Sequence, residues 1–128
     1  MATEKDKLKR ELMLKEERLL ENATRTDTLK LDEILGPGCI AQLEDGRRVD
    51  YAPGSLFDVV EGALYIESDA IDLVDLAEDC KLLVYVAAKV NKNKRSKYRC
   101  GSVWKKADGT WKIAFHQRTP MPDKAPGA

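Results

Sequence analysis

The sequence predicts an α+β fold, in which helices pack against an antiparallel sheet. Apolar residues recur at helical spacing in the first part of the chain, and β-branched and aromatic runs separated by turn residues fill the second part. Helices and strands that are segregated along a chain, rather than alternating, are typical of α+β domains. The length of 128 residues suits a single domain, residues 1–128, with one hydrophobic core.

Helical signals come first in the chain. Thr3 and Asp6 give a weak capping signal for a long helix. This helix carries one apolar stripe, formed by Leu8, Leu12, Leu19 and Leu20. A second, shorter helix is expected after Thr24 and Asp27. The Gly-Pro-Gly sequence at 36–38 is expected to end it, because a left-handed residue and a helix breaker are typical of helix ends.

A short hairpin and a third helix are expected before the main sheet. Residues 39–43 and 47–51 flank a Glu-Asp-Gly turn, which is typical of a hairpin. Ser55, followed by Asp58, gives the start signal of a helix that continues to Ala63. Four long strands in an antiparallel meander are then predicted, at about 66–76, 82–90, 98–105 and 111–118.

Composition excludes several classes of protein. Twenty-two basic and twenty-two acidic residues cancel, so no nucleic-acid partner is expected. The sequence shows neither a secretory leader nor an apolar run that could span a bilayer, so we expect a cytoplasmic location and no membrane partner. One histidine with Cys39, Cys80 and Cys100 forms no metal-binding pattern, so no metal site and no cofactor are expected. The proline-rich segment 119–128 is expected to be a loosely ordered tail.

Charge is segregated in the second half of the chain. Between residues 58 and 79 every charged residue is acidic, whereas between residues 89 and 99 every charged residue is basic. Three interpretations remain open for this pattern: solvated surfaces, a local anion site, or complementary halves that meet across a dimer.

The last hairpin has a specific predicted register. The Asp-Gly pair at 108–109 is typical of a two-residue turn, which would place Trp104 opposite Ile113. The inner face of the sheet is then expected to hold Cys100, Ser102, Trp104, Trp111, Ile113 and Phe115, with Gln117 opposite Cys100. The outer face is expected to hold Arg99, Val103, Lys105, Lys112, Ala114, His116 and Arg118. We therefore expect His116 on the surface or in a dimer interface, and not as a catalytic base.

This hairpin resembles that of a known family. It combines Ser102-Val103-Trp104, Asp108-Gly109, Trp111, Phe115-His116-Gln117 and Thr119-Pro120. The pattern is similar to the closing hairpin of an uncharacterised family of small bacterial domains in the nuclear-transport-factor-2-like superfamily. The resemblance implies a conical, cystatin-like α+β fold, in which a curved sheet wraps around helices and leaves a pocket between them. Arg118 stands where a glycine is common in that family.

Several functions are compatible with that scaffold, which ketosteroid isomerase, scytalone dehydratase and the association domain of calmodulin-dependent kinase share. We expect the binding of a small, largely apolar molecule, with the ligand-binding residues Trp104, Phe115, Ser102, Gln117 and Tyr85. The first alternative is an isomerase or dehydratase, with acid–base groups among Asp50, Tyr51, Tyr85 and Tyr98. The second alternative is a scaffold that associates through the outer sheet face. A homodimer on that face is the expected assembly.

Overall fold

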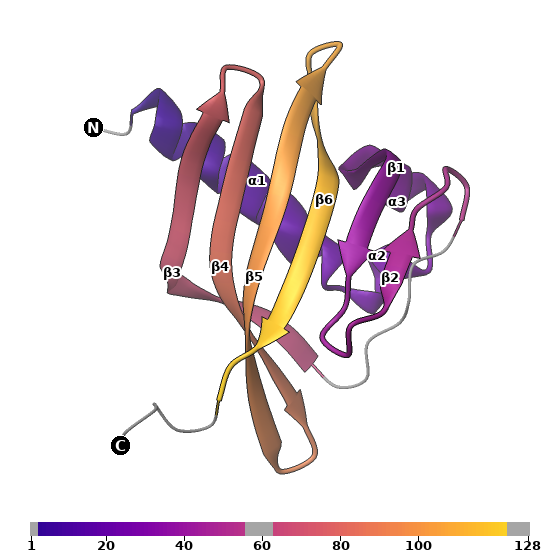
Figure 1. Cartoon of the computed structure of the whole chain (residues 1–128), viewed down its shortest axis with the longest axis vertical. Coiled ribbons are helices and arrows are strands. Elements are labelled where there is room, and N and C mark those ends of the chain that lie inside the picture. The colour runs from indigo at the N-terminus through magenta and orange to yellow at the C-terminus, as the bar shows by residue number, and fades with distance from the viewer. Residues whose placement is uncertain (1–2, 56–62, 123–128) are drawn as a thin grey trace.

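The computed structural model describes residues 3–55 and 63–122 and confirms the α+β class (Figure 1). The helices of this part of the chain are α1 (Glu4–Leu19), α2 (Asn22–Arg25) and α3 (Thr28–Ile34). The strands are β1 (Leu35–Gln42), β2 (Arg48–Asp50), β3 (Ala63–Ala77), β4 (Cys80–Asn91), β5 (Lys94–Ala107) and β6 (Thr110–Pro120). The helix expected between Ser55 and Ala63 lies outside the described residues, which omit 56–62.

Helix α1 confirms the predicted long helix. The hydroxyl of Thr3 accepts a hydrogen bond from the Asp6 N–H at 3.1 Å, and the Asp6 carboxylate accepts one from the Thr3 N–H at 3.1 Å. On the buried side of the helix, Glu16 lies between Leu12 and Leu19. The predicted apolar stripe therefore includes a fully buried carboxylate.

The second predicted helix ends earlier than expected. Helix α3 begins after Asp27, whose carboxylate accepts hydrogen bonds from the N–H groups of Leu29 and Lys30. It ends at Ile34, and the Gly-Pro-Gly sequence at 36–38 lies within β1 instead of ending the helix. The ladder between β1 and β6 is irregular across this stretch, which accommodates a proline that cannot donate a hydrogen bond.

The strands form one sheet in the order β2-β1-β6-β5-β4-β3. The predicted meander of β3 to β6 and the hairpin of β1 and β2 are confirmed. In addition, β1 pairs with β6 in a parallel direction, which was not predicted. Strand β6 continues to Pro120, into the segment expected to be a tail, and residues 123–128 are not described.

Helix α1 crosses behind the strands in the view of Figure 1, and the β4–β5 hairpin extends beyond the rest of the sheet. We call the sheet face toward α1 the inner face and the opposite face the outer face. The buried core, which includes Leu12, Leu73 and Leu83, lies between α1 and the inner face.

A β-bulge in β6 overturns part of the predicted register. Trp104 pairs with Ile113, as predicted, but its neighbour Val103 pairs with Phe115. Ala114 is therefore an extra residue without a partner in β5. Every residue of β6 after this point is displaced by one position relative to the prediction.

The bulge exchanges the faces of the residues that follow it. His116 and Arg118 were predicted on the outer face, but they lie on the inner face and are 7% and 8% exposed. Phe115 and Gln117 were predicted on the inner face, but they lie on the outer face and are partly exposed. These assignments were wrong because a period-two argument assumes an unbroken ladder, and one inserted residue reverses it.

Candidate functional site

The structure brings together three of the five expected ligand-binding residues. Trp104 and Ser102 are 0% exposed, and Tyr85 is 1% exposed. They project from β4 and β5 onto the inner face. Phe115 and Gln117 lie on the other side of the sheet, because of the bulge. A ligand-binding role for Trp104, Ser102 and Tyr85 stays a prediction. One pocket cannot include all five expected residues, because they lie on two faces of the sheet.

The buried carboxylate of Glu16 connects these side chains. Nε1 of Trp104 donates to one of its oxygens at 3.1 Å, and the Tyr85 hydroxyl donates to the other at 2.8 Å. Burial raises the pKa of Glu16 to about 6, while hydrogen bonds from Ser102, Tyr85 and Trp104 oppose that rise. Sequence reasoning missed Glu16, although its place four residues after Leu12 on the apolar stripe was a usable signal.

Ser102 joins this carboxylate to the single histidine of the chain. Its Oγ lies 2.7 Å from Nδ1 of His116. A serine hydroxyl has one proton, so when Ser102 donates to Glu16 it accepts from the Nδ1–H of His116. Burial, together with the positive charges of Arg118 and Arg25, lowers the pKa of His116 to about 3. The imidazole is therefore neutral at physiological pH.

The cluster of Glu16, Tyr85, Ser102, Trp104 and His116, which we call the polar core, has part of the chemistry of an isomerase. Such an enzyme needs an inward carboxylate with a raised pKa and a phenolic donor. Glu16 and Tyr85 have these properties. They bond to each other, however, and are 0% and 1% exposed, so the described side chains leave them no contact with a substrate. The observed arrangement instead ties α1 to β4, β5 and β6.

The other expected acid–base candidates do not join the polar core. Asp50 is exposed on β2 and forms an ion pair with Arg48 at 2.7 Å. The hydroxyl of Tyr51 donates to the carboxylate of Asp32. Tyr98 is buried beneath a lysine ammonium group, which lies 5.5 Å from the centre of its ring.

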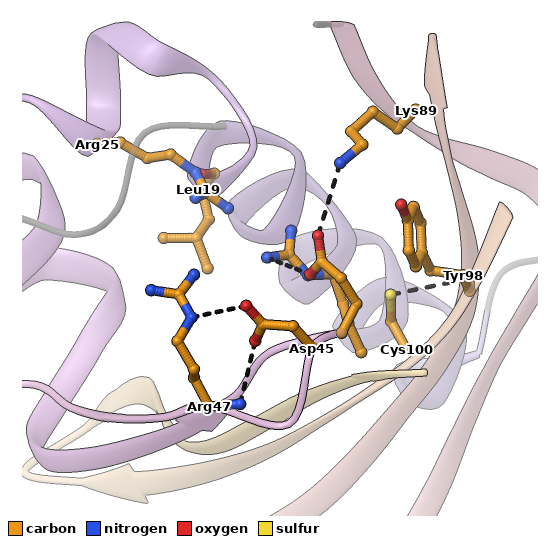
Figure 2. Close-up of polar contacts among 9 residues, drawn as sticks. Leu19, Arg25, Asp45, Arg47, Lys89, Tyr98 and Cys100 are labelled. Carbon is orange, nitrogen blue, oxygen red and sulfur yellow. Dashed lines mark hydrogen bonds and ion pairs between the residues drawn. The ribbon is translucent and has the colours of Figure 1, made fainter. Parts of the chain in front are cut away.

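A charged cluster joins the turn between β1 and β2 to the sheet. The carboxylate of Glu44 lies 3.1 Å from a guanidinium nitrogen of Arg118 and 3.6 Å from Nζ of Lys89. Figure 2 shows Lys89 extending toward this carboxylate beside the ring of Tyr98. Arg118 points inward because of the bulge, and its Nε is buried without a hydrogen-bond acceptor among the described residues.

The outer face carries an apolar row across five strands. The row consists of Val74, Leu82, Val103, Phe115 and Ile40, each paired with the next in β3, β4, β5, β6 and β1. Val74 is 37% exposed, and the other four side chains are partly exposed. Helix α1 packs on the inner face of β3 to β6, as Figure 1 shows, so this helix does not cover the row.

The described residues contain no recognisable metal centre. Between 3 and 55 and between 63 and 122, no group of histidine, cysteine and acidic side chains could hold a metal ion. Burial raises the pKa of the Cys39 and Cys100 thiols to about 12, and Cys80 is also a free thiol.

Among the helices of residues 3–55 and 63–122, none is long and apolar enough to cross a membrane.

No family model and no curated protein matches this chain. Among solved structures, the association domain of C. elegans CaMKII matches with a TM-score of 0.65 and 14% identity, over 90% of this chain and 97% of that chain. A nuclear transport factor 2-like superfamily protein from Salmonella enterica serovar Typhimurium matches with a TM-score of 0.64 and 12% identity, over 94% and 96% of the two chains. A candidate ketosteroid isomerase from Parabacteroides distasonis matches with a TM-score of 0.61 and 13% identity, over 94% and 90%.

These similarities confirm the predicted architecture. The chain has the nuclear transport factor 2-like fold, with N-terminal helices packed on a curved sheet. Proteins with this fold carry the names of enzymes and of association domains, so the fold does not select a function.

Proposed function

We propose that this protein is a self-association module that forms a homodimer through the outer face of its sheet. The observation that carries the proposal is the apolar row, which crosses five strands on the face away from α1. Large contiguous apolar patches are rare on the surface of monomeric soluble proteins, and such patches mark interaction sites. Burial of this row against a partner would remove its apolar area from water, which favours association.

A second copy of the chain is the partner that the apolar row fits. A two-fold symmetric interface needs a surface that is complementary to itself. A two-fold axis near Val103, the third of the five residues, would bring each apolar side chain of the row opposite another apolar side chain. Asp72 and Lys105 lie on the same face at either side of the row, where they would form a polar rim. The name of the C. elegans association domain supports the same choice by analogy of fold.

The binding of a small, largely apolar molecule inside the cone has less support. Trp104, Ser102 and Tyr85 are 1% exposed or less, so a ligand would have to displace side chains that now cover them. An isomerase or dehydratase meets the same obstacle, because its carboxylate and phenol would be these buried groups. Self-association needs no such rearrangement.

Sedimentation velocity tests the dimer. The wild-type protein is expected to sediment as a dimer at micromolar concentration in physiological salt. Val103→Glu places a charge at the centre of the row and should yield monomers with an unchanged far-UV spectrum. The matched control is Ala107→Glu, which adds the same charge to an exposed position of β5, beyond the row, and should remain dimeric. A monomeric wild-type protein, or equal behaviour of the two variants, would contradict the proposal.

A further inference from the structure

The extended end of the β4–β5 hairpin presents a set of polar side chains on one face. Tyr98 is buried on the inner face, so Ser96 and Lys94, which precede it by two and four positions in β5, lie on the same side of the hairpin. Their partners in β4 are Lys89 and Asn91, which share that side. The inner side of the hairpin therefore combines ammonium, amide and hydroxyl groups.

These side chains line a hollow of about 680 Å³ at the hairpin end. The lining residues are Lys89, Asn91, Lys92, Asn93, Lys94, Ser96 and Tyr98. Each of them has a hydrogen-bond donor, three are positively charged, and none is acidic. Small-molecule sites commonly have volumes of roughly 300–1,000 Å³. The size and charge of the hollow thus suit a small anion.

The two faces of the hairpin differ in how their positive charges are balanced. On the outer face, the Glu67 carboxylate pairs with Arg95 at 2.8 Å and with Lys97 at 3.2 Å. On the side of the hollow, neither Lys92 nor Lys94 has an ion-pair partner among the described residues. Uncompensated positive charge is therefore concentrated at the hollow.

The inner end of the hollow already holds a carboxylate. Lys89 lies at this end, and its ammonium group is 3.6 Å from Glu44, which also pairs with the buried Arg118 at 3.1 Å. The carboxylate of Glu44 thus balances the positive charge of Lys89 at the inner end of the hollow. The exposed end, at Lys92 and Lys94, is left for an anion from solution.

We propose that this hollow binds the phosphate groups of a small multivalent phosphate compound, with Lys92 and Lys94 as the principal charged contacts. Phosphate oxygens accept hydrogen bonds, and charge-assisted bonds from ammonium groups are stronger than neutral ones. The hollow offers no exposed ring on which a nucleic-acid base could stack, because Tyr98 is 7% exposed and lies under Lys89. Recognition therefore rests on phosphate, and the site is separate from the outer-face dimer.

Isothermal titration calorimetry with sodium tripolyphosphate tests this site. The wild-type protein should bind one tripolyphosphate per chain, with an affinity that falls as salt rises from about 50 to 200 mM. The double variant Lys92→Asn, Lys94→Gln removes two charges, and asparagine tolerates the φ of 58° at position 92. We expect its affinity to fall about tenfold or more, since two charge-assisted contacts are lost.

A matched double variant, Lys97→Gln with Arg99→Gln, removes two charges from the outer face of the same hairpin. Its affinity should fall less than about threefold, because salt screens charges that do not contact the ligand. Amide chemical-shift changes on titration should be confined to residues 89–98. Equal weakening in both double variants, or the absence of heat and of shift changes with the wild-type protein, would overturn the site.

A short single-stranded oligonucleotide tests the alternative ligand class. If it binds more tightly than tripolyphosphate at equal phosphate concentration, the surface is a nucleic-acid site and the small-ligand proposal is overturned.

Discussion

The indole N–H of Trp104 on β5 donates to the carboxylate of Glu16 on α1 at 3.1 Å, across 88 positions of sequence. Tyr85 on β4 donates to the second oxygen of the same carboxylate. A buried carboxylate is tolerated when donors of this kind surround it, so the helix and the strands depend on each other. Helix α1 therefore docks on the sheet through hydrogen bonds to an ionisable group as well as through apolar packing.

Glu16→Gln is expected to stabilise the protein at neutral pH and to have little effect in acid. Folding raises the pKa of Glu16 from 4.5 to about 6, so its ionisation disfavours the folded state. The stability that this group contributes is fully present below pH 4.5 and is lost as pH rises through 6. At neutral pH the variant should be more stable by up to about 2 kcal/mol. Urea unfolding across this pH range measures the difference, and a difference that does not change with pH would contradict the prediction.

His116→Asn is expected to reduce the loss of stability in acid. The pKa of His116 is about 3 in the folded protein, against an ordinary value of 6.5, so the unfolded chain binds a proton before the folded one does. Its contribution is present above pH 6.5 and is lost as pH falls toward 3. Between about pH 6 and pH 4 the wild-type protein should lose roughly 2–3 kcal/mol more than the variant. Denaturant titrations measure the free energy of unfolding at each pH. If this free energy changed equally with pH in the wild-type protein and the variant, the prediction would be wrong.

Trp104→Phe is expected to destabilise the protein more than Trp111→Phe. Both substitutions shrink a buried ring, but only the first removes a donor that contacts Glu16. Loss of that donor should cost about 1–3 kcal/mol beyond the loss of packing, and Trp104→Ala should cost about 3–5 kcal/mol in total. Guanidinium unfolding compares the three variants. Equal losses in the two phenylalanine variants would show that the hydrogen bond contributes nothing to stability.

Glu44→Gln is expected to destabilise the protein more than the same change combined with Arg118→Met. Arg118 is 8% exposed and lies 3.1 Å from Glu44, so the single variant leaves a buried cation without its charged partner. That loss should be about 3 kcal/mol or more, whereas replacing both partners removes the penalty. A double-mutant cycle by urea unfolding measures the coupling. If the two substitutions had additive effects on the free energy of unfolding, Glu44 and Arg118 would not be coupled and the prediction would be wrong.

Within the described residues, the sequence determined the long first helix, the short hairpin and the four-stranded meander, because these depend on neighbours along the chain. Asp27 precedes α3 as its capping residue, as its side-chain chemistry indicates. The turn at 108–109 has positive φ at both positions, 53° and 79°, which an Asp-Gly pair tolerates. Alternating apolar residues predicted the four-stranded meander, and the observed strands are the same ones with longer ends.

Only the tertiary structure decided which side chains of β6 lie inside after Ala114. The extra residue Ala114 reverses the face of the strand after it, so His116 and Arg118 are buried and Phe115 belongs to the apolar row. The parallel pairing of β1 with β6 and the donors around Glu16 likewise join segments that are distant in sequence. The physical reason is that a bulge and a buried charge are stabilised by contacts across the fold. A periodic pattern along one strand contains no information about the residue that the neighbouring strand skips.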